Sequence, residues 1–174
     1  MKTILTMLLL AAAAFAQDQA AVARLTQTAC GPNDTQFDVK TDKEQHPIST
    51  PETGKALVYV IEQEKHRGLK SVTTRVGLDG TWIGANRGDS YLFFPVEPGE
   101  HHLCSDWHVG FVAGGGKQVS LASFVAEAGK VYYFRVRTMG AKDMGNILDL
   151  DFVSSDEGQL LVASSAFSIP TAKK

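Results

Sequence analysis

The stretch "KALVYVI", residues 55–61, is apolar at every position after its lysine. β-Branched and aromatic side chains favour extended backbone, and an unbroken apolar run leaves no face for water. We therefore expect a strand that is buried on both faces. Next along the chain, Asp79-Gly80 lies inside "SVTTRVGLDGTWIGAN" (71–86). Both turn residues tolerate positive φ angles, so this stretch predicts a β-hairpin.

Two further turn signals divide the strand-like runs that follow. Pro98-Gly99 lies within "SYLFFPVEPGEHHLCSDW" (90–107), and Ala128-Gly129 lies within "QVSLASFVAEAGKVYYFRVRTM" (118–139). Each turn predicts another pair of strands. The last run, "NILDLDFV" (146–153), alternates apolar and acidic residues, which predicts a final strand. Short strands at this spacing predict an all-β fold, an antiparallel β-sandwich of seven to eight strands.

The ends of the chain differ from this region. Ser154 and Glu157 have capping-box spacing, so we expect one short C-terminal helix near residues 155–163. The β-sandwich domain then covers residues 55–168, and residues 169–174 form a loose tail. Residues 17–54 are mostly polar and predict an N-terminal arm with little regular structure beyond one short strand at Gln36–Lys40.

The first sixteen residues, "MKTILTMLLLAAAAFA", combine Lys2, a short apolar run and a small-x-small end. This pattern is typical of a Sec-type signal peptide (residues 1–16), so we expect a periplasmic or secreted protein. No later segment predicts a membrane span. Without Lys2, sixteen basic residues face nineteen acidic ones and form no basic cluster. Nucleic acid is therefore not an expected partner.

Four motifs occur in a familiar order: "KALVYVI", "VGLDGTWIGAN", "SYLFFPVEPGEHHL" and "EAGKVYYFRVR". Together they resemble the bacterial secreted family catalogued as Domain of Unknown Function 2846. The resemblance covers roughly residues 55–139. It implies a β-sandwich associated with the bacterial envelope, and it implies no activity or catalytic residues.

The stretch "PGEHHLCSDWHVG" (98–110) gathers several metal-ligand types: His101, His102, Cys104, Asp106 and His108. On a strand, the last four share one face. Their row is longer than a tetrahedral metal site, and no second His/Cys cluster is present to complete one. The alternative is a disulfide between Cys104 and Cys30, because two cysteines in an exported chain most often pair. We predict the disulfide and no metal, with the metal site as the alternative.

Three short motifs suggest chemistry that we do not expect. "GDS" at Gly88–Ser90 resembles an esterase motif, but no histidine follows His108 to activate Ser90. The same residues complete "RGDS", an adhesion motif, and adhesion through the Gly88 turn is a third possibility, although an exposed turn explains the composition as well. "GGGK" at 114–117 departs from the phosphate-loop pattern. "DLD" at Asp149–Asp151 could bind calcium, although the solvated face of an edge strand explains it as well.

The aromatic residues leave one alternative open. Most are expected in the core, while Tyr59, Tyr91, Tyr132 or Tyr133 could line a carbohydrate or peptide groove. The sequence carries no signal that identifies a ligand, its binding residues or an oligomeric state.

No intact catalytic constellation is present. We therefore expect a non-catalytic binding or structural module, not an enzyme, with no cofactor and an envelope protein or glycan as partner. The alternative is a metal-binding or hydrolytic enzyme that uses His101, His102, Asp106 and His108.

Overall fold

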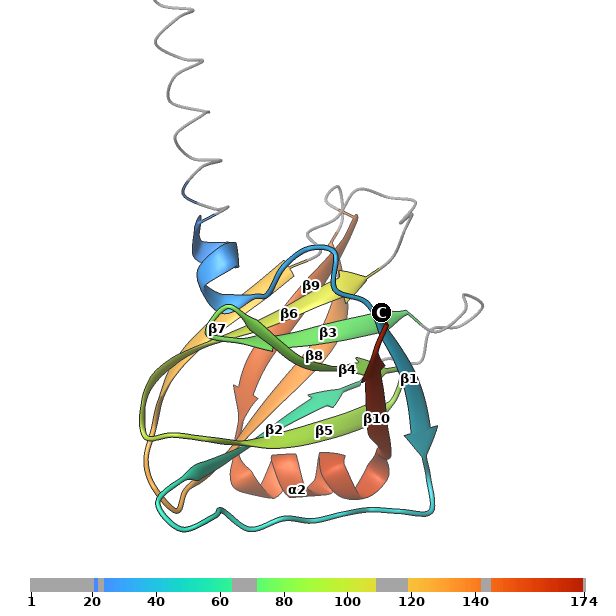
Figure 1. Ribbon diagram of the computed structural model, residues 1–174. Helices are drawn as coiled ribbons and strands as arrows, with labels where there is room; N and C mark the ends of the chain where they lie inside the picture. The colour runs from blue at the N-terminus through green and yellow to red at the C-terminus, as the bar shows by residue number, and fades with distance from the viewer. Residues whose placement is uncertain (1–20, 22–23, 64–71, 109–118, 142–144, 174) are drawn as a thin grey trace, which may run out of the picture.

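The computed structural model describes residues 21, 24–63, 72–108, 119–141 and 145–173, and these form ten strands and one C-terminal helix. Figure 1 shows how they are arranged. The strands are β1 (Phe37–Asp42), β2 (Ala56–Glu62), β3 (Thr73–Leu78), β4 (Thr81–Arg87), β5 (Ser90–Val96), β6 (Gly99–His108), β7 (Val119–Ala126), β8 (Val131–Ala141), β9 (Gly145–Val153) and β10 (Ala166–Ala172). The helix α2 (Ser155–Ser164) precedes β10. A short helical segment, residues 24–29, precedes β1.

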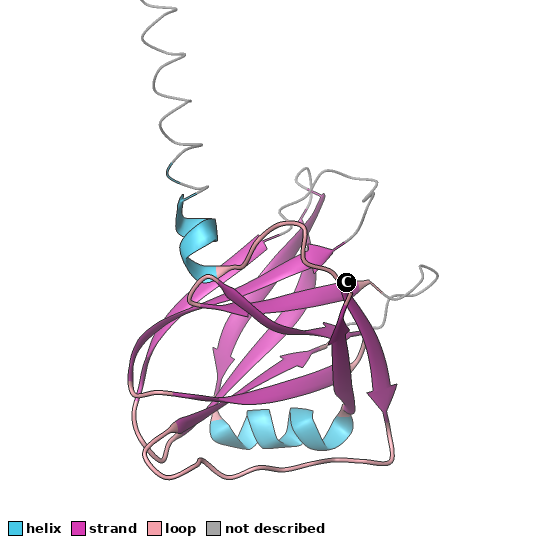
Figure 2. Ribbon diagram, viewed as in Figure 1, coloured by secondary structure: helices cyan, strands magenta, loops and turns pink. Residues whose placement is uncertain are grey.

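The strands form two sheets, as Figure 2 shows. The six-stranded sheet has the order β1-β10-β5-β2-β8-β9, and the four-stranded sheet has the order β4-β3-β6-β7. The predicted all-β class is confirmed, but the predicted count of seven to eight strands is too low. The expectation of purely antiparallel pairing is also wrong, because β2 pairs with β8 and β5 pairs with β10 in parallel.

Strand β2 is buried along its whole length, as "KALVYVI" predicts. It lies inside the six-stranded sheet, between β5 and β8. Val58 and Val60 join an apolar cluster that also contains residues of the four-stranded sheet. Tyr59 and Ile61 join a second cluster with residues of α2 on the opposite face. The strand is therefore apolar throughout because each of its faces meets a different core.

The Asp79-Gly80 hairpin between β3 and β4 is confirmed. Asp79 has φ 49° and Gly80 has φ 79°, the left-handed values that a tight hairpin turn requires. The other two predicted turns are not hairpins. Pro98-Gly99 joins β5 of the six-stranded sheet to β6 of the four-stranded sheet, and Ala128-Gly129 carries β7 back to β8. Turn chemistry marks where a strand ends but does not specify the sheet that the chain enters next.

The C-terminal residues correct another expectation. Helix α2 is confirmed, and Ser154 caps it by accepting a hydrogen bond from the backbone N–H of Glu157. The prediction of a loose tail at 169–174 is wrong, because β10 continues to Ala172 and pairs with β1. Pro170 lacks an N–H group, yet beyond Phe167 the strand is paired only with β1. The edge of β10 that faces away from β1 forms no ladder at Pro170, so the missing N–H group leaves no hydrogen bond unmade there.

Helix α2 packs closely on the six-stranded sheet at Gly158. A Cβ atom at this position would lie 2.2 Å from Cγ of Tyr133. In an exposed helix, alanine would gain about 1 kcal/mol over glycine. Here we expect Gly158→Ala to destabilise the protein by about 1–2 kcal/mol, since overpacking outweighs helix propensity. Urea unfolding measures this change, with the exposed Gln159→Ala as the matched control. A stabilised Gly158→Ala variant would contradict the packing.

Candidate functional site

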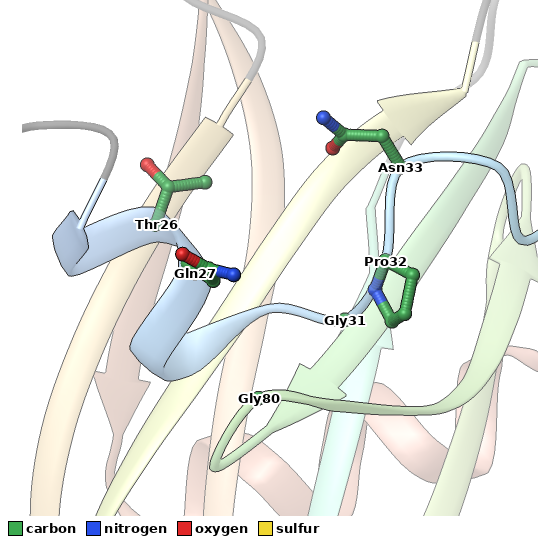
Figure 3. A pocket seen from close by; sticks show the side chains of 6 residues that line it. All are labelled: Thr26, Gln27, Gly31, Pro32, Asn33 and Gly80. Atoms are coloured by element: carbon green, nitrogen blue, oxygen red, sulfur yellow. The ribbon is translucent and has the colours of Figure 1, made fainter.

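Strand β6 carries the residues that suggested a site. Leu103 and Trp107 lie in the core between the sheets, as expected from the alternation. Cys104 lies instead in a small cluster with Ala29, Cys30 and partly buried Trp82. The N-terminal arm thus crosses the outer face of the four-stranded sheet, and Figure 3 shows this crossing near the β3–β4 turn.

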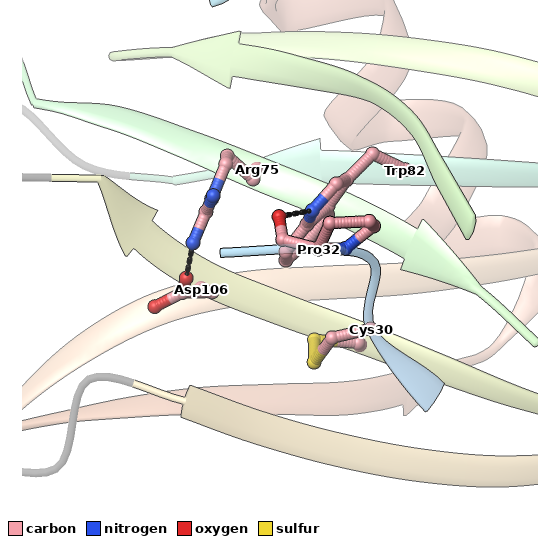
Figure 4. Close-up of a disulfide and its surroundings, with 6 residues drawn as sticks. Cys30, Pro32, Arg75, Trp82 and Asp106 are labelled. Atoms are coloured by element: carbon pink, nitrogen blue, oxygen red, sulfur yellow. Dashed lines mark hydrogen bonds and ion pairs between the residues drawn. A yellow bond between two sulfur atoms is a disulfide. The ribbon is translucent and has the colours of Figure 1, made fainter. Parts of the chain in front are cut away.

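The predicted disulfide is confirmed. Cys30 and Cys104 are joined, with their Cα atoms 5.2 Å apart and a sequence separation of 74. Both residues are buried, and the described residues contain no free cysteine. The bond ties the arm to the centre of the four-stranded sheet, as Figure 4 shows for the Cys30 end.

Arg75 on β3 is the second contact between arm and sheet, and sequence reasoning missed it. Its side chain is 5% exposed and forms an ion pair with Asp106 on β6 (Figure 4). Its Nη1 donates to the backbone carbonyl oxygens of Asn33 at 3.2 Å and Thr35 at 2.8 Å. The guanidinium therefore binds one carboxylate and two arm carbonyls at once. A charged residue inside the strand-like "TTRVGL" was the signal that could have predicted a buried partner.

Trp82 on β4 completes this contact. Its Nε1 donates to the Pro32 carbonyl oxygen at 2.7 Å, and its ring lies 4.2 Å from the Arg75 guanidinium carbon (Figure 4). Gly31 fits against the same ring, since a Cβ atom there would lie 2.3 Å from Trp82 Cδ1. The arm can approach the sheet this closely only without a side chain at position 31. Arg75 and Trp82 together fix the backbone of the arm after Cys30.

His101 lies beside the β3–β4 turn, with both ring nitrogens engaged. Nδ1 is 2.6 Å from a carboxylate oxygen of Asp79, and Nε2 is 2.7 Å from the carbonyl oxygen of Glu97. Burial lowers the pKa of His101, but the hydrogen bonds to Asp79 and Glu97 outweigh it, so the net pKa is raised. Burial likewise raises the pKa of Asp79, yet bonds from the His102 backbone N–H and from His101 hold it below its usual range. Neither imidazole nitrogen is left to act as a general base.

The residues of the alternative metal site on β6 are not brought together as a ligand set in the described part of the chain. Cys104 is oxidised in the disulfide, and Asp106 is paired with Arg75. His102 remains half-buried beside them, while the side chain of His108 lies outside the described residues. Within the described part of the chain, no group of three or more His, Cys, Asp or Glu side chains is placed to hold a metal ion.

The carboxylates of "DLD" on β9 face arginines of β8. Asp149 accepts from Arg137 at 3.1 Å, and Asp151 accepts from Arg135 at 3.2 Å and from Arg137 at 2.6 Å. Strand β9 is the edge of the six-stranded sheet, as the edge-strand interpretation expected. The arginines already neutralise the oxygens that a calcium ion would need.

The "GDS" motif forms the turn between β4 and β5. Ser90 is fully buried, and its Oγ accepts hydrogen bonds from the Arg87 backbone N–H and from Ser168 Oγ. A buried hydroxyl held in this way is not presented to a substrate or to an adhesion receptor. The "GGGK" motif at 114–117 lies outside the described residues.

Three of the four candidate groove tyrosines belong to the core. Tyr59, Tyr91 and Tyr133 are buried between the six-stranded sheet and α2, where Tyr59 and Tyr133 stack at 5.2 Å between ring centroids. Burial raises the pKa of Tyr91 to about 12, and its hydroxyl donates to the Pro47 carbonyl oxygen. Tyr132 is half-buried, and its hydroxyl accepts from the Glu127 backbone N–H. Core packing therefore explains the first three rings.

A cavity of about 500 Å³ lies where the arm meets the β3–β4 turn (Figure 3). The arm supplies Thr26, Gln27, Pro32 and Asn33, and the turn supplies Gly80. None of its described lining residues carries an ionisable side chain. Sequence reasoning missed this cavity, because it arises only where two segments distant in sequence meet.

Comparison with family models, curated proteins and solved structures found no match for this chain. The family resemblance stays a prediction. Across the described residues, the helices fall short of the length and apolar character needed to cross a membrane.

Removing the disulfide should loosen the arm. We expect the double variant Cys30→Ala, Cys104→Ala to lose about 4 kcal/mol of unfolding free energy, because the bond closes a long loop in the unfolded chain. Urea unfolding measures the loss, with the m value fitted separately for each variant because the cross-link also compacts the unfolded chain. The reduced wild-type protein serves as a second comparison. A loss below about 1 kcal/mol would show that the arm is held by other contacts.

The buried ion pair predicts a second large effect. Asp106→Asn leaves the Arg75 charge without its carboxylate, so we expect a loss of about 3–5 kcal/mol. The matched control is Asp149→Asn, which breaks a more exposed aspartate–arginine pair and should cost less than about 1 kcal/mol. Equal losses in the two variants would contradict the assigned role of Arg75.

The His101 contacts predict a pH dependence. A raised folded pKa means that His101 contributes stability below its unfolded pKa of about 6.5, and the contribution is lost as pH rises through the folded pKa. The stability difference between wild type and His101→Gln should therefore be largest near roughly pH 5 and shrink towards roughly pH 9. Urea unfolding across this range measures it, with His46→Gln as the control. A difference that grows with pH would refute the assignment.

Proposed function

We propose that this chain is an exported, non-catalytic binding or structural module with a β-sandwich fold, acting in the bacterial envelope on a protein or glycan partner. The proposal includes membership of the secreted family catalogued as Domain of Unknown Function 2846, which the motifs in residues 55–139 resemble. The apolar cluster shared by the two sheets supports the sandwich arrangement.

One observation carries the non-catalytic part of the proposal: three reactive side chains of β6 are used inside the fold. Cys104 bonds to Cys30, Asp106 pairs with Arg75, and both nitrogens of His101 face acceptors. A nucleophile or base must offer a free atom to its substrate. These side chains instead fix the arm and the β3–β4 turn, which supports a binding or structural role.

A substrate screen tests this proposal. We expect the pure protein to give no turnover of ester, glycoside, phosphate or peptide substrates above buffer. Reproducible turnover that is lost in Ser90→Ala or His102→Ala, but kept in the matched Ser164→Ala, would overturn it. Stoichiometric metal in untagged protein would favour the metal-enzyme alternative.

Export rests on the predicted signal peptide at residues 1–16, which lie outside the described residues. The buried disulfide supports it, because such bonds persist in oxidising compartments. The intact mass of protein isolated from the envelope and alkylated without reductant tests both the removal of the signal peptide and the disulfide. We expect a chain that lacks residues 1–16, carries no alkyl group and is two hydrogens lighter than the dithiol. A full-length, doubly alkylated chain would contradict export.

A further inference from the structure

The cavity between the arm and the β3–β4 turn carries polar groups that the fold does not use. Thr26, Gln27 and Asn33 line it, and their side chains have no hydrogen-bond partner among the described residues. Two amides and one hydroxyl therefore offer both donors and acceptors to a ligand. This contrasts with Cys104 and Asp106 on β6, which are bonded inside the fold.

The backbone around these groups is held in place. Cys30 is bonded to β6, Trp82 binds the Pro32 carbonyl oxygen, and Arg75 binds the Asn33 carbonyl oxygen. Gly80 of the β3–β4 turn packs against the backbone of the arm, since a Cβ atom at Gly80 would be 3.2 Å from the Gln27 carbonyl oxygen. Both walls of the cavity are thus fixed before a ligand arrives, which lowers the entropy cost of binding.

The absence of charge in the described lining limits the class of ligand. The cavity has no ionisable side chain there, and the nearby Arg75 is already paired with Asp106. A charged ligand would lose hydration without gaining a counter-ion. The cavity volume of about 500 Å³ falls within the range of about 300–1,000 Å³ typical of small-molecule sites.

We propose that this cavity binds a neutral glycan, with Gln27 and Asn33 hydrogen-bonded to neighbouring hydroxyl groups of a sugar ring. The inference rests on the proposed function and names its ligand class. Each sugar hydroxyl can donate and accept, which matches the two groups of a side-chain amide. The Pro32 ring and the Cα carbons of Gly31 and Gly80 are apolar parts of the lining, against which the C–H face of the sugar would pack. A peptide would instead be bound along a strand edge or in apolar pockets, and the described lining includes no strand edge.

Nuclear magnetic resonance titration of the full mature protein tests this proposal. The probes are cellobiose, maltose and N,N′-diacetylchitobiose, each at about 10 mM, ten times a Kd of about 1 mM. We expect at least one of them to shift the side-chain amide signals of Gln27 and Asn33 in a saturable way. The double variant Gln27→Ala, Asn33→Ala should weaken binding at least about tenfold, while Gln159→Ala on α2 should bind like wild type.

Three results would overturn the inference. They are no shift with any disaccharide, binding unchanged in the double variant, or shifts with a blocked neutral tripeptide but with no sugar. In each case the proposed non-catalytic function can still stand, because the substrate screen tests it separately. If a disaccharide binds at Gln27 and Asn33 and is also hydrolysed, the glycan site stands and the non-catalytic proposal fails.

Discussion

The Cys30–Cys104 bond is the constraint on which the outer face of the four-stranded sheet depends. The arm buries few apolar groups there, chiefly Ala29 and Cys30 beside Trp82 and Val119. Ordering each arm residue costs about 1–2 kcal/mol of backbone entropy, more than so small a cluster returns. A covalent link lowers that cost by restricting the unfolded chain as well. The remaining contacts of the arm can then be polar.

The polar contacts of the arm follow from that link. Once Cys30 is fixed, the arm lies over β3 and β4, where Arg75 and Trp82 bind the backbone carbonyls of Pro32, Asn33 and Thr35. Covering Arg75 removes water from its guanidinium, which makes the Asp106 carboxylate necessary. The ion pair thus depends on the disulfide. The bond places the arm, the arm covers the charge of Arg75, and this charge requires a carboxylate, which Asp106 on the neighbouring strand β6 supplies.

Local signals in the sequence predicted the local features of the fold. The apolar run of β2, the Asp79-Gly80 turn, the Ser154 cap and the cysteine pair are each determined by a few residues, and all are confirmed. The sheet crossing at Pro98-Gly99 was missed, because a turn does not encode the next pairing partner. Strand β10 was missed for a similar reason, since only tertiary context makes its proline tolerable. In the site, the cysteine pairing was predictable, but spacing along β6 could not show that Asp106 pairs with Arg75 of the neighbouring strand.

The two outer faces of the protein are covered by different means, and this difference indicates where a ligand can bind. Apolar side chains of α2, Leu161 and Val162, cover the six-stranded sheet, and the tyrosines beneath them are buried. The arm covers the four-stranded sheet through one covalent bond and bonds to its backbone carbonyls, and the side chains of Gln27 and Asn33 make no hydrogen bond among the described residues. Groups that a fold leaves unpaired on a rigid support are suited to binding. The same contacts that engage Cys104 and Asp106 inside the fold therefore hold the arm rigid, with the side chains of Gln27 and Asn33 left unpaired on it.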